Sequence, residues 1–375
     1  MRQLFGRVVS SIAAPAAWVC SIIATLALGL VACASALGAS GDAVSQELAV
    51  RIGPRLLLVS VGGGHRRVAA EMPAWVTFTP DGNSIVYTGS NGQARGASLF
   101  VQALDGKRRR LTRPVVHGRL AAEDTQAAVS PDGKLVAFIR DRQLGSGRHR
   151  ESLLVVPLAG GTPRTLRQIE YGHGDPPPIV QAAWSPDGTT LAVVVNRRVL
   201  LLSATGDLLR VLSQQEAVAN STLAWSPDGR EIAVAAGIHA DIDVQPQPSE
   251  QLQVLPITEG TPRTLLTCRL GCTSPAWSPD GKSIAIADDT GPDGPIGPVL
   301  AIRILDAQTG AIRWSSNPRQ LYLRDGPTWS PDSRYLAFSR LTTWMPYTPR
   351  SDTTILDTTT RRVFAIPDAF PFAWR

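Results

Sequence analysis

The sequence lacks any long amphipathic helical pattern. Beyond residue 50, no run of a dozen residues places apolar side chains at helical spacing. This absence argues against helical bundles and helical solenoids. The 375 residues instead include 33 Gly and 29 Pro, a composition typical of a chain with many turns. The length is sufficient for one large core or for two domains.

A strong charge imbalance is also missing. The formal net charge is +6, and loss of a leader that contains Arg2 and Arg7 lowers it to +4, spread along the chain. This mild excess indicates solubility, and no nucleic-acid partner is expected. The densest basic run, residues 107–110 with Arg113, is expected on an outermost strand, where Lys and Arg protect an edge from pairing. Binding of an anionic partner, such as lipid headgroups or a cell-wall polymer, is the alternative for this run.

The N-terminal segment has no charged residue between positions 8 and 41. A basic start followed by an apolar stretch is typical of a signal peptide or an uncleaved membrane anchor. Its end, Leu30-Val31-Ala32-Cys33, resembles the bacterial lipobox, and the resemblance implies lipidation of Cys33. Ordinary cleavage at residues 34–36 and an uncut span over residues 8–33 are the alternatives. Each of the three places the body of the protein outside the cytoplasm, attached to a bacterial membrane or secreted.

Cysteine is scarce, and only Cys268 and Cys272 of the four lie beyond the leader. Outside the cell, an even pair this close in sequence is expected to form a disulfide that rigidifies one local turn. The alternative is half of a metal site. No second Cys pair and no nearby His supports it, so no metal and no cofactor are expected.

What the sequence has in quantity is one repeated phrase, an aromatic or apolar residue followed by Ser-Pro-Asp-Gly or a near copy. Pro presets φ for a tight turn, Asp bonds nearby backbone amides, and Gly accepts a positive φ. Each copy is followed by an apolar run that reads as a strand. The Asp of the six copies falls at positions 81, 132, 187, 228, 280 and 332.

Four antiparallel strands in every 40 to 55 residues indicate an all-β fold, a β-propeller. There are six turn motifs but seven pairs of following outer strands, because one extra pair lies at residues 55–70. The last residues, ending in Trp374-Arg375, look like a repeat cut short before its turn. The prediction is seven four-stranded blades, with six as the fallback, and a ring closed by the C-terminal strand in the N-terminal blade. Equivalent Trp side chains are expected to wedge between blades, at positions 184, 225, 277, 329 and 374.

Residues 275–285, Pro-Ala-Trp-Ser-Pro-Asp-Gly-Lys-Ser-Ile-Ala, resemble the repeat of TolB-like β-propeller proteins almost letter for letter. The resemblance extends over about residues 51–375 and recurs six times. The predicted domains are therefore a signal peptide or membrane anchor (1–33), a tether (34–50) and a TolB-like propeller (51–375). The same repeat occurs in prolyl-oligopeptidase-like peptidases, but this sequence has no Gly-x-Ser-x-Gly nucleophile elbow.

Long connections, among them residues 139–151 and 168–181, are expected on the face of the ring opposite the Ser-Pro-Asp-Gly turns, and this long-loop face is the predicted binding surface. Tolerated insertion is the competing explanation. Segment 171–175 would bring an aromatic residue and a titratable pair to the mouth of the pore, and a flexible Gly-rich loop is the favoured alternative. Segment 239–243 has a His and two carboxylates at alternate positions, which would suit a cation if they lie on a strand, and a solvated edge is the favoured alternative. The candidate binding residues are Tyr171, His173, His239, Asp241, Tyr322, Trp344 and Tyr347.

The sequence therefore predicts a monomeric, non-enzymatic binding module of the bacterial cell envelope, with a protein or polymer partner and no catalytic residues. The alternative is a propeller enzyme, related to oligosaccharide lyases, that uses His173 and His239 at the mouth of the pore. These two hypotheses differ in a checkable way, because a metal-dependent lyase requires its His residues to converge near the central axis.

Overall fold

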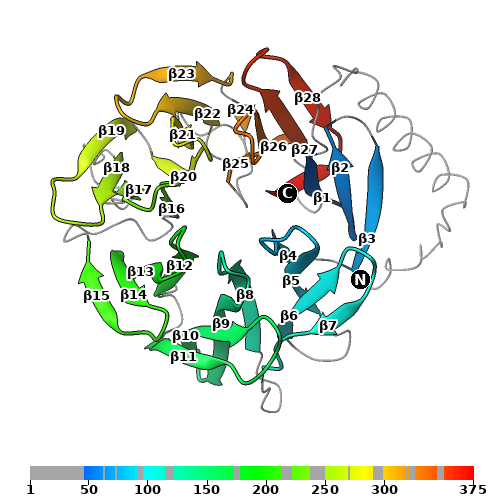
Figure 1. Ribbon diagram of the computed structural model, residues 1–375, viewed down its shortest axis with the longest axis vertical. Coiled ribbons are helices and arrows are strands. Elements are labelled where there is room, and N and C mark those ends of the chain that lie inside the picture. The colour runs from blue at the N-terminus through cyan, green and yellow to red at the C-terminus, as the bar shows by residue number, and fades with distance from the viewer. Residues whose placement is uncertain are drawn as a thin grey trace, which may run out of the picture.

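The computed structural model describes residues 46–61, 64–71, 74–90, 96–114, 122–172, 175, 178–212, 222–236, 250–268, 271–289, 299–317, 319–320, 326–343 and 350–375. All regular elements in these ranges are β-strands. They form a ring of twisted sheets that radiate from a common centre (Figure 1). The all-β propeller predicted from the repeat is confirmed. No helix within these ranges is long and apolar enough to cross a membrane.

Antiparallel pairing joins the described strands in sets of four consecutive neighbours, with one strand of each set at the centre of the ring (Figure 1). The first three sets, from the innermost strand outward, are β29 (Ala369–Trp374), β1 (Glu47–Ile52), β2 (Arg55–Ser60) and β3 (His65–Glu71); β4 (Ala74–Phe78), β5 (Ser84–Ser90), β6 (Gly96–Ala103) and β7 (Arg108–Arg110); and β8 (Ala122–Val129), β9 (Leu135–Gly145), β10 (Arg148–Pro157) and β11 (Arg164–Tyr171).

Four further sets continue around the ring: β12 (Ile179–Trp184), β13 (Thr190–Val195), β14 (Arg198–Ser203) and β15 (Leu208–Val211); β16 (Leu223–Trp225), β17 (Glu231–Ala236), β18 (Glu250–Pro256) and β19 (Arg263–Cys268); β20 (Cys272–Trp277), β21 (Ser283–Asp289), β22 (Val299–Asp306) and β23 (Ile312–Ser315); and β25 (Thr328–Trp329), β26 (Tyr335–Thr343), β27 (Arg350–Asp357) and β28 (Val363–Ile366). The short strand β24 (Arg319–Gln320) also pairs with β22. Each set is one blade.

The two ends of the described chain meet in one blade, where β29 runs antiparallel to β1. In Figure 1 the red C-terminal strand lies inside the blue N-terminal strands. Leu48, Ala49 and Val50 of β1 are fully buried. The blade therefore includes residues 47–50, which the sequence boundary assigns to the tether, because their apolar side chains pack against neighbouring strands.

The repeated turn is held by its own side chains. In one copy, Ser226 Oγ donates to Asp228 Oδ1 at 2.7 Å, and the same oxygen accepts from the backbone N of Arg230 at 3.1 Å. Ser226 Oγ also accepts from the backbone N of Glu231 at 2.9 Å, and Gly229 has φ 71°. The polar atoms of the phrase are therefore used within the turn, which makes the motif part of the scaffold.

At four of the five repeated Trp positions the indole N–H bonds to the preceding blade. Trp277 Nε1 is buried and has no hydrogen-bond partner among the described residues. Trp184 Nε1 donates to the backbone O of Ala128 at 3.1 Å, and Trp374 Nε1 donates to that of Thr328 at 3.1 Å. Trp225 and Trp329 make the equivalent bonds to Ala183 and Ala276. These residues sit between neighbouring blades because a large apolar ring with one donor fills such a wedge and also finds an acceptor.

The basic residues of the outermost strands also join blades. Arg164 donates to the backbone O of Ala204 in the next blade at 2.7 Å, and Arg263 donates to that of Gln308 at 3.0 Å. Within the run 107–110, Arg109 donates to Leu158 O of the next blade, and the Arg108 guanidinium lies 4.0 Å from the Phe100 ring centroid. These contacts favour the structural explanation for Arg108 and Arg109.

Candidate functional site

The third blade extends beyond its neighbours through a long hairpin. β9 has 11 residues and β10 has 10. A tight turn joins them at Ser146 and Gly147, both of which have positive φ. The sequence predicted loops over 139–151 and 168–181, and this was wrong for most of 139–151 and for the two ends of 168–181, which lie in β11 and β12. The backbone pairing of β9, β10 and β11 continues into these segments.

Four chemically active side chains lie on one face of this extension. The register places Asp141 opposite Glu151 and His149 opposite Tyr171. Residues directly opposite each other in an antiparallel pair point to the same face, as do residues two apart on one strand. This face is directed toward the next blade, because Glu151 Oε2 accepts from the backbone N of Ile179 on β12 at 2.7 Å.

Asp141 is the centre of the cluster. Its Oδ2 lies 2.9 Å from His149 Nδ1, and its Oδ1 accepts from the Tyr171 hydroxyl at 3.2 Å. The His149 and Tyr171 rings are tilted, with centroids 5.3 Å apart. Burial raises the pKa of Tyr171, as do the negative charges of Asp141 and Glu151, so this side chain is a neutral donor at any ordinary pH. The result is a partly exposed aromatic surface whose polar groups are held in fixed orientations.

Glu151 lies deeper between the third blade and the next one, and it is 5% exposed. Burial raises its pKa to about 7, the hydrogen bond from Ile179 N opposes this shift, and the charge of Asp141 adds to it. A carboxylic acid of this kind changes its charge near neutral pH. Because it also bonds the first residue of β12, its protonation is coupled to the contact between the two blades.

We expect the Glu151→Gln substitution to flatten the pH dependence of stability. The folded-state pKa of about 7 lies above the ordinary value of 4.5. The protonated Glu151 side chain therefore makes its full contribution to stability below pH 4.5, and this contribution is lost as the pH rises through 7. The free energy of unfolding is measured in urea at pH 5, 6, 7 and 8. Between pH 5 and 8 it should fall by about 2 kcal/mol in the wild type, and the Gln variant should not show this fall.

Glu170→Gln is the matched control for this prediction. Its hydrogen bond from Arg150 lowers the pKa of Glu170, so this carboxylate is ionised throughout the window. The Glu170→Gln variant should keep the wild-type slope between pH 5 and 8. A Glu151→Gln variant with an unchanged slope would show that Glu151 does not titrate there.

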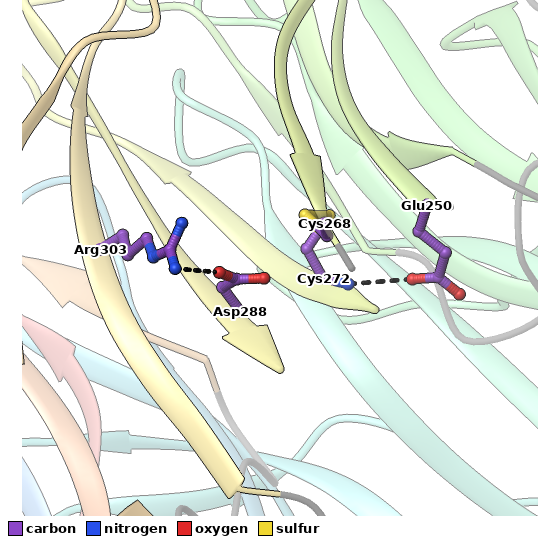
Figure 2. The surroundings of a disulfide bond; sticks show 5 residues. All are labelled: Glu250, Cys268, Cys272, Asp288 and Arg303. Carbon is purple, nitrogen blue, oxygen red and sulfur yellow. Dashed lines mark hydrogen bonds and ion pairs between the residues drawn. A yellow bond between two sulfur atoms is a disulfide. The ribbon is translucent and has the colours of Figure 1, made fainter. Parts of the chain in front are cut away.

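A second boundary between blades also has a Glu carboxylate that accepts a hydrogen bond from the backbone of the next blade. Glu250 Oε2 accepts from the backbone N of Cys272 on β20 at 2.9 Å, at the point where Cys272 is joined to Cys268 by a disulfide (Figure 2). The sequence predicted this bond as a brace for one local turn, and in the structure it connects the outermost strand of one blade to the innermost strand of the next. Nearby, Arg303 pairs with the buried carboxylate of Asp288 at 2.9 Å. Buried Glu residues therefore support blade-to-blade connections in two places.

Of the predicted binding residues, Tyr171 is the one that the structure describes. His173, His239, Asp241, Tyr322, Trp344 and Tyr347 lie outside the described residues, as does Cys33. The sequence did not single out Asp141 and Glu151. The alternation of His149 and Glu151 was a usable signal, since a period of two on a strand places both on one face. Within the described ranges, no three His, Cys, Asp or Glu side chains are grouped to hold a metal ion.

Comparison with known proteins gives one curated relative of limited extent. No family model matches the sequence. Over 83 residues the chain is 35% identical to an uncharacterized peptidase, YuxL, of Bacillus subtilis (strain 168). The match covers 22% of this chain and 11% of the relative, so the chain spans a small part of the relative's length.

Solved structures match over much more of the chain. A periplasmic gluconolactonase of Pseudomonas aeruginosa is 15% identical, with a TM-score of 0.56 over 88% of this chain and 99% of that one. An oligogalacturonate lyase in complex with manganese is 14% identical, with a TM-score of 0.56 over 76% and 79%. TolB from Acinetobacter baumannii is 17% identical over 89% and 67%, with a TM-score of 0.49. At these identities the likeness concerns the fold, and this chain is a β-propeller.

Proposed function

We propose that the chain is a non-enzymatic binding module of the bacterial cell envelope, which presents its long-loop face to a protein or polymer partner. The observation that carries the proposal is the surface formed by Asp141, His149 and Tyr171 on the extended hairpin of the third blade. Its rings are partly exposed and its polar atoms are fixed by hydrogen bonds. Side chains held in this way by a rigid sheet lose little entropy when a partner binds.

The chemistry of this surface suits a partner with apolar and donor groups together. Tyr side chains contribute strongly to interfaces because they offer a large area with few rotatable bonds. Asp141 adds a carboxylate that accepts hydrogen bonds, and Glu123 lies opposite it on β8. A sugar ring or a peptide with hydroxyl or amine groups fits this combination.

An extracytoplasmic location is part of the proposal. The Cys268–Cys272 disulfide supports it, since such bonds persist mainly in oxidising compartments. The N-terminal sequence supports membrane attachment, either through lipid on Cys33 or through an uncleaved anchor. Mass measurement of the mature N-terminus tests this part separately: a diacylglyceryl group on Cys33 is expected, and an intact Met1 or a start after residue 36 contradicts lipidation.

Capture from the native envelope tests the binding function. The immobilised full chain should retain a reproducible partner, and Tyr171→Ala should weaken that binding by about 2 kcal/mol, roughly 30-fold in Kd. Lys134→Ala, at a side chain that is 79% exposed beside the Pro-Asp-Gly turn, should bind as the wild type does. The proposal fails if Tyr171→Ala and Lys134→Ala capture the partner equally well.

The pairing of Asp141 with His149 favours a propeller enzyme as the second candidate. A carboxylate that accepts from Nδ1–H leaves Nε2 of the neutral imidazole as an acceptor, which is the arrangement of a general base. Assays on acidic oligosaccharides with His149→Gln and Asp141→Asn separate the two candidates. Turnover by the purified wild type that both variants lose by 100-fold or more would replace the binding proposal.

A further inference from the structure

The opposite face of the same hairpin is rich in arginine. Arg140 and Arg142 of β9 alternate with Asp141, so they point toward the preceding blade, formed by β4 to β7. Phe138 lies on that side and packs against Val86 and Leu99 of the preceding blade. Arg150 lies directly opposite Arg142 on β10. Three arginines therefore share one face of the hairpin, at the long-loop end of the boundary between the second and third blades.

The described acids on this face are already paired. Arg140 makes a bidentate ion pair with Asp124, at 2.6 and 2.9 Å, and the Asp124 side chain is fully buried. Arg150 donates to Glu170 Oε1 at 2.6 Å, and Arg148 pairs with the other oxygen of Glu170. One carboxylate thus serves two arginines.

Arg142 lies between Ala122 on β8 and Arg150 on β10. Among the described residues, its Nε atom is buried and has no hydrogen-bond partner. Like charges directly opposite each other in a sheet are destabilising, and a buried donor without an acceptor adds a further cost. An anion bound at Arg142 would remove both costs.

The preceding blade supplies more positive charge to this boundary. Burial and the nearby charge of Arg113 lower the pKa of Arg110, while Asp124 opposes this, which places the three groups within electrostatic reach. Arg110 also donates to Ser98 Oγ at 2.9 Å. Between positions 82 and 122 the sequence contains one acid, Asp105. Asp105 accepts from the backbone N of Lys107 in a turn.

We propose that this arginine seam, formed by Arg110, Arg113, Arg140, Arg142 and Arg150, binds a phosphate group, with Arg142 as its principal donor. The planar guanidinium fork matches two phosphate oxygens, and charge-assisted hydrogen bonds of this kind are among the strongest in proteins. The seam faces away from the surface of Asp141, His149 and Tyr171, so the site is separate from the proposed partner surface and is testable independently of it.

A calorimetric titration tests the site. Inorganic phosphate is added to the full chain in neutral detergent, and chloride keeps the ionic strength constant. Arg142→Gln should weaken phosphate binding about tenfold or more. It should not lower the stability of the phosphate-free protein, because it removes the repulsion from Arg150. Arg142→Lys keeps the charge without the fork and should bind with intermediate affinity. Arg230→Gln, at a side chain that is 85% exposed on a Pro-Asp-Gly turn, is the matched control.

A second arm replaces inorganic phosphate with phosphatidylglycerol mixed into the micelles, compared with phosphatidylcholine. Binding of inorganic phosphate that depends on Arg142 assigns the site to the free anion. Binding of phosphatidylglycerol alone, with the same dependence, assigns it to a lipid headgroup. Both results support the phosphate site. The proposal is overturned if the wild type binds neither ligand, or if Arg142→Gln binds either as tightly as the wild type and Arg230→Gln do.

Discussion

A chain shortened by residues 369–375 is expected to lose its cooperative folded state. These residues form β29, which pairs with β1 from Leu48 to Ile52. They also contribute the buried Ala369 and Trp374, and removal of a single buried Trp side chain typically costs about 3–5 kcal/mol. The whole strand therefore accounts for a large part of the roughly 5–15 kcal/mol that stabilises a typical protein. Urea unfolding followed by Trp fluorescence and circular dichroism measures the loss.

The deletion also removes contacts to other parts of the ring. The Arg375 side chain pairs with Glu47 and donates to the backbone O of Gly82 at 2.8 Å, which lies in the next blade. Arg375→Ala alone should cost about 1–2 kcal/mol and leave a cooperative transition. Addition of a synthetic peptide of residues 369–375 to the shortened chain should restore part of the lost stability. A shortened chain that unfolds at the wild-type urea concentration would show that β29 is dispensable.

Breaking the ion pair between Asp124 and Arg140 is expected to have the second largest effect. Asp124→Asn leaves the Arg140 guanidinium, 14% exposed, without its bidentate carboxylate. Removal of one partner from a buried pair costs about 3–5 kcal/mol, because the remaining charge is buried without compensation. The negative charge of Asp124 also stabilises the positive charge of Arg110, against the repulsion from Arg113. Loss of the Asp124 charge therefore increases the net repulsion among the arginines. The free energy of unfolding in urea at pH 7 measures the effect.

A double substitution separates the ion pair from the packing of its side chains. Asp124→Leu combined with Arg140→Met should cost much less than the sum of the two single changes, because no charge is left buried. Lys134→Ala breaks an exposed pair with Asp132 and should change stability by about 0–1 kcal/mol. If Asp124→Asn costs no more than Lys134→Ala, the pair contributes no more than a surface contact.

The fold was predictable because its signals are local. Each Ser-Pro-Asp-Gly turn uses its own Ser hydroxyl, Asp carboxylate and Gly φ, as in the turn from Ser226 to Gly229. The Trp before it repeats with the blade and bonds the neighbouring blade. A contact repeated at a fixed sequence interval can be recognised without coordinates. The irregular connections carry no such repeat, which is why 139–151 was expected to be a loop.

The candidate sites were less predictable because they depend on pairing between strands. Tyr171 was identified as a candidate from its sequence, but its contacts with Asp141 and His149 come from two other strands. The opposition of Arg142 and Arg150 follows from the register of β9 and β10, and a shift of one residue would exchange the acidic and basic faces of the hairpin.

The sequence by itself determined the β-propeller, its turns and the pairing of Cys268 with Cys272, because each of these arises from residues that are close along the chain. Only the tertiary structure decided how the third blade divides its chemistry, with Asp141, His149 and Tyr171 on one face and Arg140, Arg142 and Arg150 on the other. The physical reason is that alternation along a strand separates residues onto two faces, while the ring of blades determines which neighbour each face meets.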